Sequence, residues 1–303
     1  HRYRYCSQSQ DTFQELNMKL SIITINLNNK NGLSETISSV IAQTFTDYEY
    51  IIIDGQSTDG SLEVIKQNAN HINQWISEND HGIYNAMNKG LNLAKGEYCL
   101  FLNSGDSLYD SDVLQVLFSQ SFTEDIISGG IELYSHTKKW YQFPPHNISL
   151  FTFINGSLPH PGTFIRRELL NKLGGYNENY RIISDWCFFV DALIVQNCSY
   201  KYYDITVSKF NCFGISSTSS STEDVQKVQF LRNRFPKMAD DYDLFNEESV
   251  FNSFCWLKYH PIIKVIIVFP FKILNRILHL RNRLKKRIIV LDKLKSDDTK
   301  LLR

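Results

Sequence analysis

The feature that most constrains this chain is an alternation of short apolar runs with helical patterns, which begins at Leu20 and continues to Leu102. The apolar runs are typical of buried strands, and apolar residues spaced three or four apart are typical of amphipathic helices. The predicted strands are Leu20–Leu27, Tyr50–Ile53, Gln74–Ile76 and Glu97–Leu102, and the predicted helices are Leu33–Ala42, Ser61–Gln67 and Ile83–Ala94. This pattern predicts an α/β fold, in which helices cover both faces of a Rossmann-like, mixed but mainly parallel sheet.

The rest of the chain fits a second part of the same fold. It contains a further helix after Leu108, short strands at Thr163–Ile165 and near 125–143, and a helix that starts at about Ser184. With 303 residues, of which 43% are hydrophobic, the chain is long enough and apolar enough to bury a substantial core. Its six cysteines are scattered without paired spacing, which favours buried free thiols.

Polar residues follow each of the first four predicted strands. In a parallel sheet the carboxyl ends of the strands share one edge, and ligands bind there. Each residue alone also suits a turn or a helix cap, but four consecutive strand ends with carboxylates or amides favour a binding site. The residues are Asn26, Asn28, Asp54, Glu78, Asp80, Asn103 and Asp106.

Three of the carboxylates suggest chemistry. Asp54 is placed to accept hydrogen bonds from a base or a ribose, and Asp106 is placed to hold a divalent cation against a diphosphate. Asp185 is either a helix cap or a general base. The chain has neither a GxxxxGK[ST] nor a GxGxxG loop, which argues against a kinase and a dinucleotide-dependent dehydrogenase.

Seven motifs occur in an order that resembles the family-two glycosyltransferases, and together they cover about two thirds of the chain, from Lys19 to Ser216. They are SIITINLNN at 21–29, DGQSTDG at 54–60, SENDHGIYNAMNKG at 77–90, GEYCLFLNSGD at 96–106, HPGTF at 160–164, GGY at 174–176 and SDW at 184–186. The resemblance implies a GT-A fold and the inverting transfer of a sugar from a nucleotide sugar, usually a UDP-sugar, to a hydroxyl. It is of the type found in bacterial surface polysaccharide biosynthesis.

The resemblance also implies roles for individual residues. Asp185 matches the catalytic base, and Asp106 would bind Mn²⁺ or Mg²⁺ that bridges the two phosphates. Asn103 and His160 are candidate contacts to the acceptor or the sugar, together with Trp186. The nucleoside would be held by Thr24, Asn26, Asn28, Asp54 and Asp80.

We expect three parts along the chain, of which the resemblance covers only the middle one. Residues 1–17 are a tag or loose extension, residues 18–222 are the catalytic domain, and residues 223–303 are a helical C-terminal region with a basic amphipathic tail. The catalytic domain divides into a nucleotide-binding half at about 18–108 and an acceptor half at about 109–222. This chain departs from the family pattern at Asn103 and Gly105, where many members have Asp, and at Ser184, where Glu is common.

The C-terminal tail has a charge of its own. From Lys272 to Arg303 it carries eleven Lys or Arg against three Asp, although the whole chain is neutral, and its apolar residues recur at helical spacing. This pattern favours either a helix on an anionic membrane surface, which is the preferred hypothesis, or a helix packed on protein. The run Ile262–Phe271 is too short to span a bilayer. We therefore expect a cytoplasmic protein on the inner face of the plasma membrane, without a nucleic-acid partner; the pattern does not indicate an oligomeric state.

Two other functions remain open from the sequence. A non-catalytic module that binds a nucleotide sugar or a glycan would account for the reduced metal motif, although both Asp106 and Asp185 are retained. A nucleotidyltransferase would share the metal chemistry but lacks a visible Gly-rich basic loop for a triphosphate. The prediction we carry forward is a glycosyltransferase that extends a glycan, with a lipid-linked acceptor.

Overall fold

The computed structural model describes residues 3–6, 18–135, 138–212 and 220–236. The strands are β1 (Tyr3–Cys6), β2 (Leu20–Asn26), β3 (Tyr48–Asp54), β4 (Gln74–Ser77), β5 (Tyr98–Phe101), β6 (Ser107–Leu108), β7 (Ile126–Tyr134), β8 (Lys139–Gln142), β9 (Thr163–Arg166) and β10 (Tyr200–Asn211). The helices are α1 (Lys30–Ile41), α2 (Ser61–Gln67), α3 (Ile83–Leu93), α4 (Val113–Phe118), α5 (Leu150–Ile154), α6 (Arg167–Lys172), α7 (Ser184–Val190) and α8 (Ser220–Arg234). Short turns of helix add η1 (Ala69–His71), η2 (His160–Gly162) and η3 (Asp191–Val195), the last with π-helical geometry.

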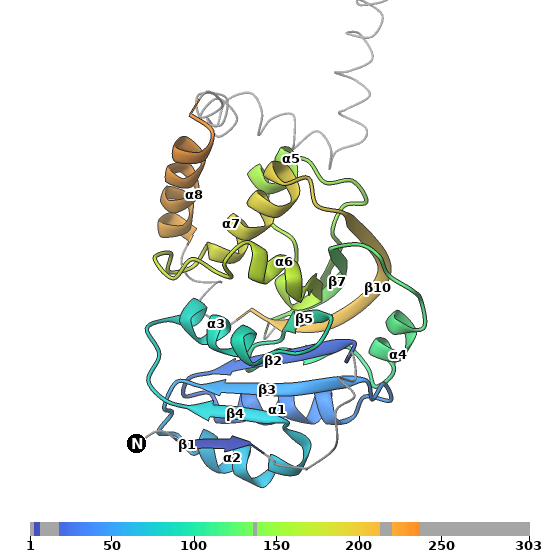
Figure 1. Cartoon of the computed structure of the whole chain (residues 1–303), viewed down its shortest axis with the longest axis vertical. Helices are drawn as coiled ribbons and strands as arrows, with labels where there is room; N and C mark the ends of the chain where they lie inside the picture. The colour runs from blue at the N-terminus through green and yellow to red at the C-terminus, as the bar shows by residue number, and fades with distance from the viewer. Residues whose placement is uncertain (1–2, 7–17, 136–137, 213–219, 237–303) are drawn as a thin grey trace, which may run out of the picture. The chain divides into compact units, whose positions relative to one another are not determined.

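The described strands form one mixed sheet in the order β1-β4-β3-β2-β5-β9-β7-β10-β6, and β8 pairs with β7. Figure 1 shows β1, β4, β3 and β2 one above the other in this order. The neighbours β4, β3, β2 and β5 run parallel, as the β–α alternation predicted. The strand β9 is antiparallel to both of its neighbours and joins this parallel half to β7 and β10. The predicted mixed, mainly parallel α/β sheet is therefore confirmed.

The central strands are buried on both faces, because every residue of β2 is buried. On one face, α1, α2 and α4 contribute to the main apolar cluster. On the other face, α3 packs against β2 and β3. A Cβ at Gly90 would lie 2.4 Å from Cγ2 of Ile23, so only glycine permits this close approach of α3 to the sheet.

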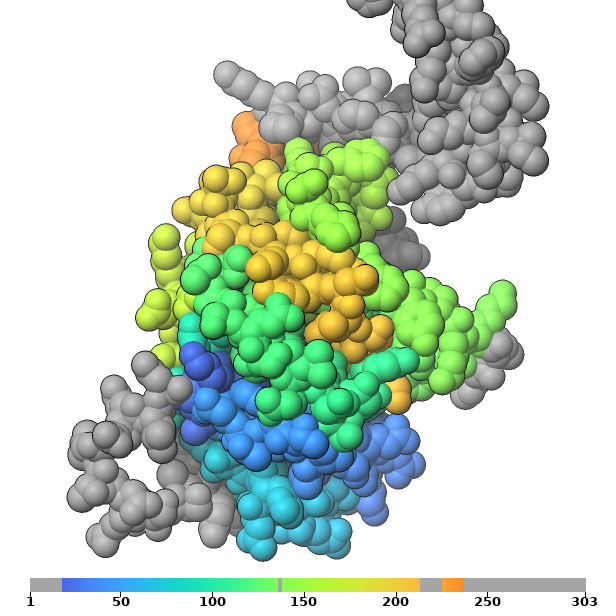
Figure 2. Space-filling model, turned by 90° about the vertical axis from the view of Figure 1, so that its right-hand side faces the viewer, coloured from blue at the N-terminus to red at the C-terminus, as the bar shows by residue number. Residues whose placement is uncertain are grey.

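The strand β10 differs most from the sequence prediction, which assigned no strand there. It runs parallel to β7 over most of the length of both strands. In Figure 2 its gold surface is bordered by green segments from earlier in the chain. Among the short strands predicted near 125–143, those within residues 126–134 form one strand, β7, because the parallel partner β10 pairs with both halves of it.

The predicted boundaries of the catalytic domain, at residues 18 and 222, stay predictions. The compact unit extends to Arg234, so the predicted boundary at 222 falls inside α8. Within the predicted loose extension, Tyr3–Cys6 pair with β4 as an edge strand, whereas residues 7–17 lie outside the described residues. The amphipathic tail predicted within residues 237–303 also lies outside them, and in the described part of the chain no helix is both long and apolar enough to cross a membrane.

Candidate functional site

Three parallel strands end in side chains that bond to one another across the sheet. Asn26 is the register partner of Asp54, and Asp54 is the register partner of Ser77. Oδ1 of Asp54 accepts hydrogen bonds from Nδ2 of Asn26 at 2.8 Å and from Oγ of Ser57 at 2.6 Å. Oδ2 accepts from Oγ of Ser77 at 2.7 Å and from the backbone amide of Ser57 at 3.0 Å. These four bonds fill the roughly four acceptor positions that a carboxylate offers.

Two of the predicted nucleoside contacts, Asp54 and Thr24, bond to groups inside the protein, and their contact with a nucleoside stays a prediction. Asp54 is 0% exposed and its acceptor positions are filled within the protein, so it orders the turn after β3. Thr24 is also 0% exposed, and its hydroxyl donates to the carbonyl oxygen of Leu102 at 2.7 Å. Its side chain therefore joins β2 to the segment after β5. The sequence placed both residues near the correct edge without revealing that they point into the protein.

The surface beside this network carries the other predicted nucleoside contacts. Asn28 is exposed, and its Oδ1 accepts from the backbone amide of Thr58 at 2.8 Å. Leu27 is 61% exposed, and Asp80 lies close to it, since a Cβ built on Gly55 would approach both side chains. An exposed leucine beside a half-buried carboxylate provides an apolar surface and a hydrogen-bond acceptor next to each other. The sequence analysis did not single out Leu27.

Asp80 is held by a lysine from α3. Nζ of Lys89 lies 2.6 Å from Oδ1 of Asp80 and 3.1 Å from Oε1 of Glu78. Burial raises the pKa of Asp80 above its usual value, although the lysine acts in the opposite direction. Burial by itself would lower the pKa of Lys89, but the hydrogen bonds to Asp80 and Glu78 outweigh it and raise that pKa. Lys89 therefore fixes the orientation of Asp80.

The loop that carries Asp106 is built on α1. The hydroxyl of Thr36 lies 2.6 Å from the carbonyl oxygen of Asp106, and it accepts from the amide of Gly105 at 3.0 Å. The Asp106 carboxylate is 5% exposed and accepts a long hydrogen bond, 3.3 Å, from the amide of Asn211 in β10. Burial raises the pKa of Asp106 to about 7, and the backbone amides oppose only part of this shift. Few hydrogen bonds offset the burial of this carboxylate, so a bound cation would stabilise its charged form.

The neighbouring Asn103 supports a metal at this position. Its Oδ1 is buried and accepts no hydrogen bond from the described residues. Carboxylate and amide oxygens are the donors that Mg²⁺ and Mn²⁺ take, and such metals often keep waters and substrate phosphates as their other ligands. Within the described part of the chain, no group of three or more His, Cys, Asp or Glu side chains is placed to hold a metal. The Asp106 carboxylate and the Asn103 amide oxygen fit a divalent cation whose other ligands would be waters and phosphate oxygens.

The predicted base, Asp185, lies in the first turn of α7 and is only partly buried. Its Oδ1 accepts a hydrogen bond from the hydroxyl of Tyr84, at 2.8 Å, and Tyr84 lies in α3. The same hydroxyl is also within hydrogen-bond distance of the carbonyl oxygen of Ile182. No residue that the structure describes donates a hydrogen bond to Oδ2 of Asp185. The sequence analysis did not identify Tyr84, because its role depends on a contact between residues 101 positions apart.

An aromatic cluster joins the base to the segment of the metal loop. The ring of His160 stacks on Phe101 at 5.3 Å, and its Nε2 lies 2.8 Å from the hydroxyl of Tyr176. Burial lowers the pKa of His160, while the charge of Asp185 acts in the opposite direction. Phe101 is two residues before Asn103 in the chain, so the cluster connects the two parts of the site. The prediction that His160 contacts the acceptor stays a prediction.

Trp186, which was also predicted to contact the acceptor or the sugar, is buried, and that contact stays a prediction. It is 2% exposed, and its indole N–H donates to the carbonyl oxygens of Phe153 and Gly156. The ring of Phe230 from α8 lies 5.5 Å from the indole. Because both its N–H and its ring are in contact with other parts of the protein, Trp186 anchors α7.

Comparison with known proteins agrees with this geometry. A family model described as glycosyl transferase family 2 matches residues 21–192. The chain is 30% identical to a "PGL/p-HBAD biosynthesis glycosyltransferase" of Mycobacterium tuberculosis, over 69% of this chain and 83% of that protein. It is 27% identical to a "Cholesterol galactosyltransferase" of Borreliella burgdorferi, over 92% of this chain and 84% of that protein. The chain belongs to glycosyl transferase family 2 and is a glycosyltransferase.

Solved structures confirm the GT-A fold. S. aureus TarS 1–349 in complex with UDP-GlcNAc aligns with a TM-score of 0.59 at 19% identity, over 78% of this chain and 69% of that one. The mannosyltransferase PcManGT from Pyrobaculum calidifontis, in complex with GDP-Man and Mn²⁺, aligns with a TM-score of 0.52 at 16% identity, over 72% and 63% of the two chains. The chain spans 44% of the longer S. aureus TarS chain that also aligns with it.

Proposed function

We propose that this protein is an inverting glycosyltransferase that transfers a sugar from a nucleotide sugar to a hydroxyl of a glycan acceptor, which is carried on a lipid. The observation that carries the proposal is the presence of two incompletely satisfied carboxylates, Asp106 and Asp185, on separate segments. Asp54, by contrast, has every acceptor position filled within the protein. Because hydrogen-bond acceptor positions remain open on both carboxylates, Asp106 is suited to bind a cation and Asp185 to accept a proton.

In the proposed reaction each carboxylate has one task. Asp185 accepts the proton of the acceptor hydroxyl while that oxygen bonds to the anomeric carbon, and the bond from this carbon to the diphosphate oxygen breaks with its electron pair. Asp106 and Asn103 would hold Mn²⁺ or Mg²⁺, and such a cation would supply charge neutralisation for the departing nucleoside diphosphate. Attack from the face opposite the leaving group inverts the anomeric centre.

The nucleoside is proposed to lie against Leu27, Asn28 and Asp80. The apolar surface of Leu27 suits one face of a base, and the carboxylate of Asp80, oriented by Lys89, suits a donor group on the base or ribose. The TarS neighbour, solved with UDP-GlcNAc, makes UDP-sugars the first donors to test. The hydrogen bonds of Asp54 order the turn after β3, which lies beside this surface.

The lipid-linked acceptor rests on two observations. The relative from Borreliella burgdorferi is named a cholesterol galactosyltransferase, so a lipid is the acceptor in its name. The basic segment from Lys272 to Arg303 suits attachment to an anionic membrane, where such an acceptor resides. Bacterial surface polysaccharide biosynthesis on the cytoplasmic face of the membrane is the setting we propose.

The first experiment measures nucleoside diphosphate release from a panel of UDP- and GDP-sugars with Mn²⁺, with Mg²⁺ and with chelator, in the presence of a bacterial lipid extract. We expect metal-dependent release from one donor, together with a lipid product that gains one sugar. The stereochemistry of that product, determined by NMR, should be inverted relative to the donor. Retention at the anomeric carbon would contradict the proposed mechanism.

The same experiment tests the alternative of a non-catalytic binding module. The motivation for this alternative is the thinned metal motif, in which Asn103 and Gly105 stand where many relatives have Asp. A donor that binds in calorimetry but is not consumed with any acceptor would favour the binding module. Release of pyrophosphate from a nucleoside triphosphate would instead indicate a nucleotidyltransferase.

A further inference from the structure

We infer that Tyr84 is a positioning residue for the general base Asp185, an inference that rests on the proposed function. Tyr84 lies in the first turn of α3, and Asp185 lies in the first turn of α7. The hydroxyl of Tyr84 meets Oδ1 of Asp185 at 2.8 Å. The hydrogen bond occupies one oxygen of the carboxylate and so sets the orientation of the other, Oδ2, which no described residue bonds. Oδ2 is then the oxygen that takes the proton of the acceptor.

The surroundings of the Tyr84 hydroxyl suit both protonation states of the base. The hydroxyl has one proton but two acceptors within reach, Oδ1 of Asp185 and the carbonyl oxygen of Ile182. When Asp185 is ionised, Tyr84 donates its proton to the carboxylate. When Asp185 has taken a proton on Oδ2, Oδ1 is still an acceptor, and Tyr84 can donate to it or to the carbonyl oxygen of Ile182. The same side chain therefore holds the base in place before and after proton transfer.

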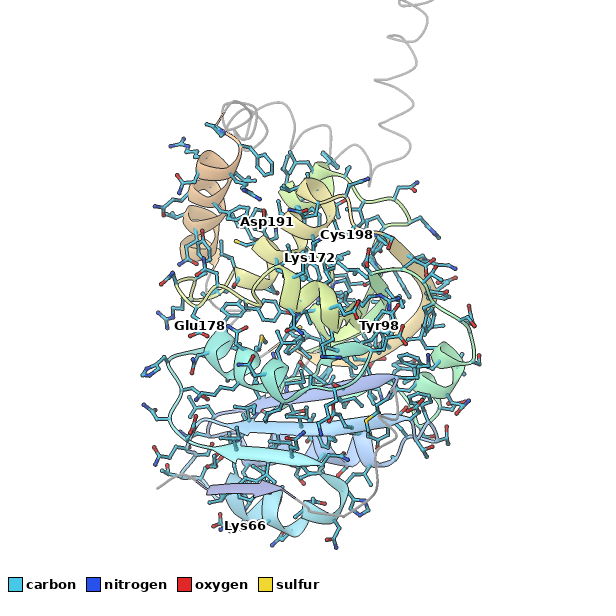
Figure 3. The ribbon with its side chains drawn as sticks, in the orientation of Figure 1. Lys66, Tyr98, Lys172, Glu178, Asp191 and Cys198 are labelled. Atoms are coloured by element: carbon cyan, nitrogen blue, oxygen red, sulfur yellow. The ribbon has the colours of Figure 1, made fainter. Side chains whose placement is uncertain are left out.

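Tyr84 is itself held firmly on both sides. It is 4% exposed, and its ring lies 5.6 Å from that of Tyr176. One turn further along α3, Asn88 bonds both the amide and the carbonyl of Tyr176, at 2.9 and 2.8 Å. Nδ2 of Asn88 and Nδ2 of Asn85 both lie 2.9 Å from the carboxylate of Glu178, which Figure 3 shows beside α3. The helix is thus tied to the segment that leads into α7.

A glycine makes this attachment possible. Gly175 has φ +71°, in the left-handed region, and a Cβ there would lie 2.6 Å from Oδ1 of Asn88. A larger residue would therefore separate the segment from α3. Since Lys89 of the same helix binds Asp80, α3 connects the proposed nucleoside surface to the base. This connection sets the distance between the donor and the proton acceptor.

Three other titratable groups face Asp185, and none of them carries a positive charge near pH 7. Tyr84 is therefore the group among the four that stabilises the negative charge of Asp185. The three other groups are His160 from η2, Tyr176 from the segment before α7, and Cys187 from α7 itself. Burial lowers the pKa of His160 and raises the pKa of Tyr176 and of Cys187, so all three are neutral near pH 7. Burial, together with the charge of Asp185, also raises the pKa of Tyr84, which keeps its hydroxyl protonated as a donor.

The test compares Tyr84→Phe with wild type by initial rates of nucleoside diphosphate release from roughly pH 5.5 to 9. We expect kcat near pH 7 to fall by about 10- to 100-fold, while the donor KM changes by less than about twofold. The acidic limb of the profile should move to higher pH by about one unit, because a carboxylate that loses a donated hydrogen bond is protonated more easily. At high pH the variant should recover part of its rate.

Tyr48→Phe is the matched control. The Tyr48 hydroxyl also lies within hydrogen-bond distance of a backbone carbonyl oxygen, that of Val40, at 3.1 Å, but it lies at the start of β3, away from the strand ends that carry the site. We expect it to lose similar thermal stability while its pH profile stays unchanged. If Tyr84→Phe is too unstable to assay, 3-fluorotyrosine at position 84 keeps the shape and makes a stronger donor. Its acidic limb should then move to lower pH, opposite to that of the Phe variant.

Three outcomes separate this inference from the proposed function. If Tyr84→Phe or the fluorinated protein keeps the wild-type profile while Asp185→Asn is inactive, the positioning role is wrong and the base assignment stands. If Tyr84→Phe loses activity only in proportion to its unfolded fraction, its role is structural and the inference is overturned. If Asp185→Asn keeps full activity, the proposed base itself is wrong.

Discussion

Asp54 at the end of β3 and Asp185 at the start of α7 are both conspicuous carboxylates in the sequence, but the protein treats them differently. Asp54 is fully buried and accepts four hydrogen bonds from three side chains and one amide. Asp185 is partly exposed and accepts one bond, from Tyr84, among the described residues. A carboxylate whose acceptor positions are all filled holds the backbone together. One with positions left over is available for a substrate or a proton.

The same contrast distinguishes the two halves of the site. The half that ends β2, β3 and β4 is rigid, because its polar groups bond to one another in register. The half that carries Asp106 and Asp185 is built on packing around the carboxylates, and their oxygens keep free capacity. We therefore expect substitutions in the first half to act mainly on stability and substitutions in the second to act mainly on turnover.

The largest effect is expected from Asp185→Asn. Removal of a general base costs roughly 10²- to 10⁴-fold in rate, so we expect kcat to fall about a thousandfold, with little change in the melting temperature. Initial rates of nucleoside diphosphate release measure the loss. Asp204→Asn, at an exposed position in β10, is the control and should keep wild-type activity.

Asp106→Asn should follow, with a loss of about a hundredfold in kcat/KM, since a divalent cation supplies several kcal/mol of charge stabilisation. Isothermal titration with Mn²⁺ and a nucleoside diphosphate should show weaker metal binding. The exposed Asp110 lies four positions along the chain, and Asp110→Asn should bind metal as wild type does. Unchanged metal affinity in Asp106→Asn would remove Asp106 from the metal site.

Asp54→Asn tests the carboxylate whose hydrogen-bond acceptor positions are all filled. The amide would face donors that now bond to a carboxylate, so we expect the free energy of unfolding to fall by about 2 kcal/mol or more. Urea denaturation followed by circular dichroism measures this change. At a temperature where the variant is folded, its kcat should stay within about threefold of wild type, because Asp54 acts through the turn it orders. A large loss of kcat with unchanged stability would show that Asp54 takes part in turnover.

Lys89→Met tests the connection from α3 to the nucleoside surface. Without the ammonium group, Asp80 and Glu78 repel one another and lose their orientation, so we expect the donor KM to rise about tenfold with kcat nearly constant. Equilibrium binding of the free nucleoside diphosphate should weaken in parallel. Lys95→Met, at an exposed position just after α3, should leave donor binding unchanged.

The smallest effect concerns pH and His160. Burial holds the pKa of His160 below the usual 6.5, so the folded state binds fewer protons than the unfolded state in acid. Stability should therefore fall as the pH drops below 6.5, by roughly 1 kcal/mol for each pH unit until the folded pKa is passed. Melting temperatures of wild type and His160→Gln, measured across this range, test the slope. The His160→Gln variant should lose this slope of stability against pH, whereas His71→Gln, at an exposed position, should retain the slope.

The parallel half of the fold was predictable because buried parallel strands are nearly continuous apolar runs. The bounds predicted for α2 match the structure, and β2 differs by one residue. The strand β10 was not predicted, because it mixes tyrosines with Lys201, Asp204 and Lys209, a pattern that also suits a surface segment. Its pairing with β7 joins residues far apart in the chain, which local periodicity does not reveal.

The site was predictable to the level of segments and not of side-chain direction. The sequence placed Thr24 and Asp54 at the correct edge of the sheet, but whether a side chain faces inward depends on the neighbouring strand. Trp186 follows Asp185 directly, yet it points to the carbonyl oxygens of Phe153 and Gly156. Tyr84 was not recognised, since a tyrosine on the buried face of a helix is ordinary until its partner from a distant segment is known.

The register alignment of Asn26, Asp54 and Ser77 has a consequence for how this part of the chain can change in length. Successive side chains of a strand point to opposite faces, so inserting or deleting one residue within β2, β3 or β4 would turn one of the three away from the others. The helices and loops between these strands are under no such restriction. Among relatives, gaps in an alignment should therefore fall between these strands and never within them.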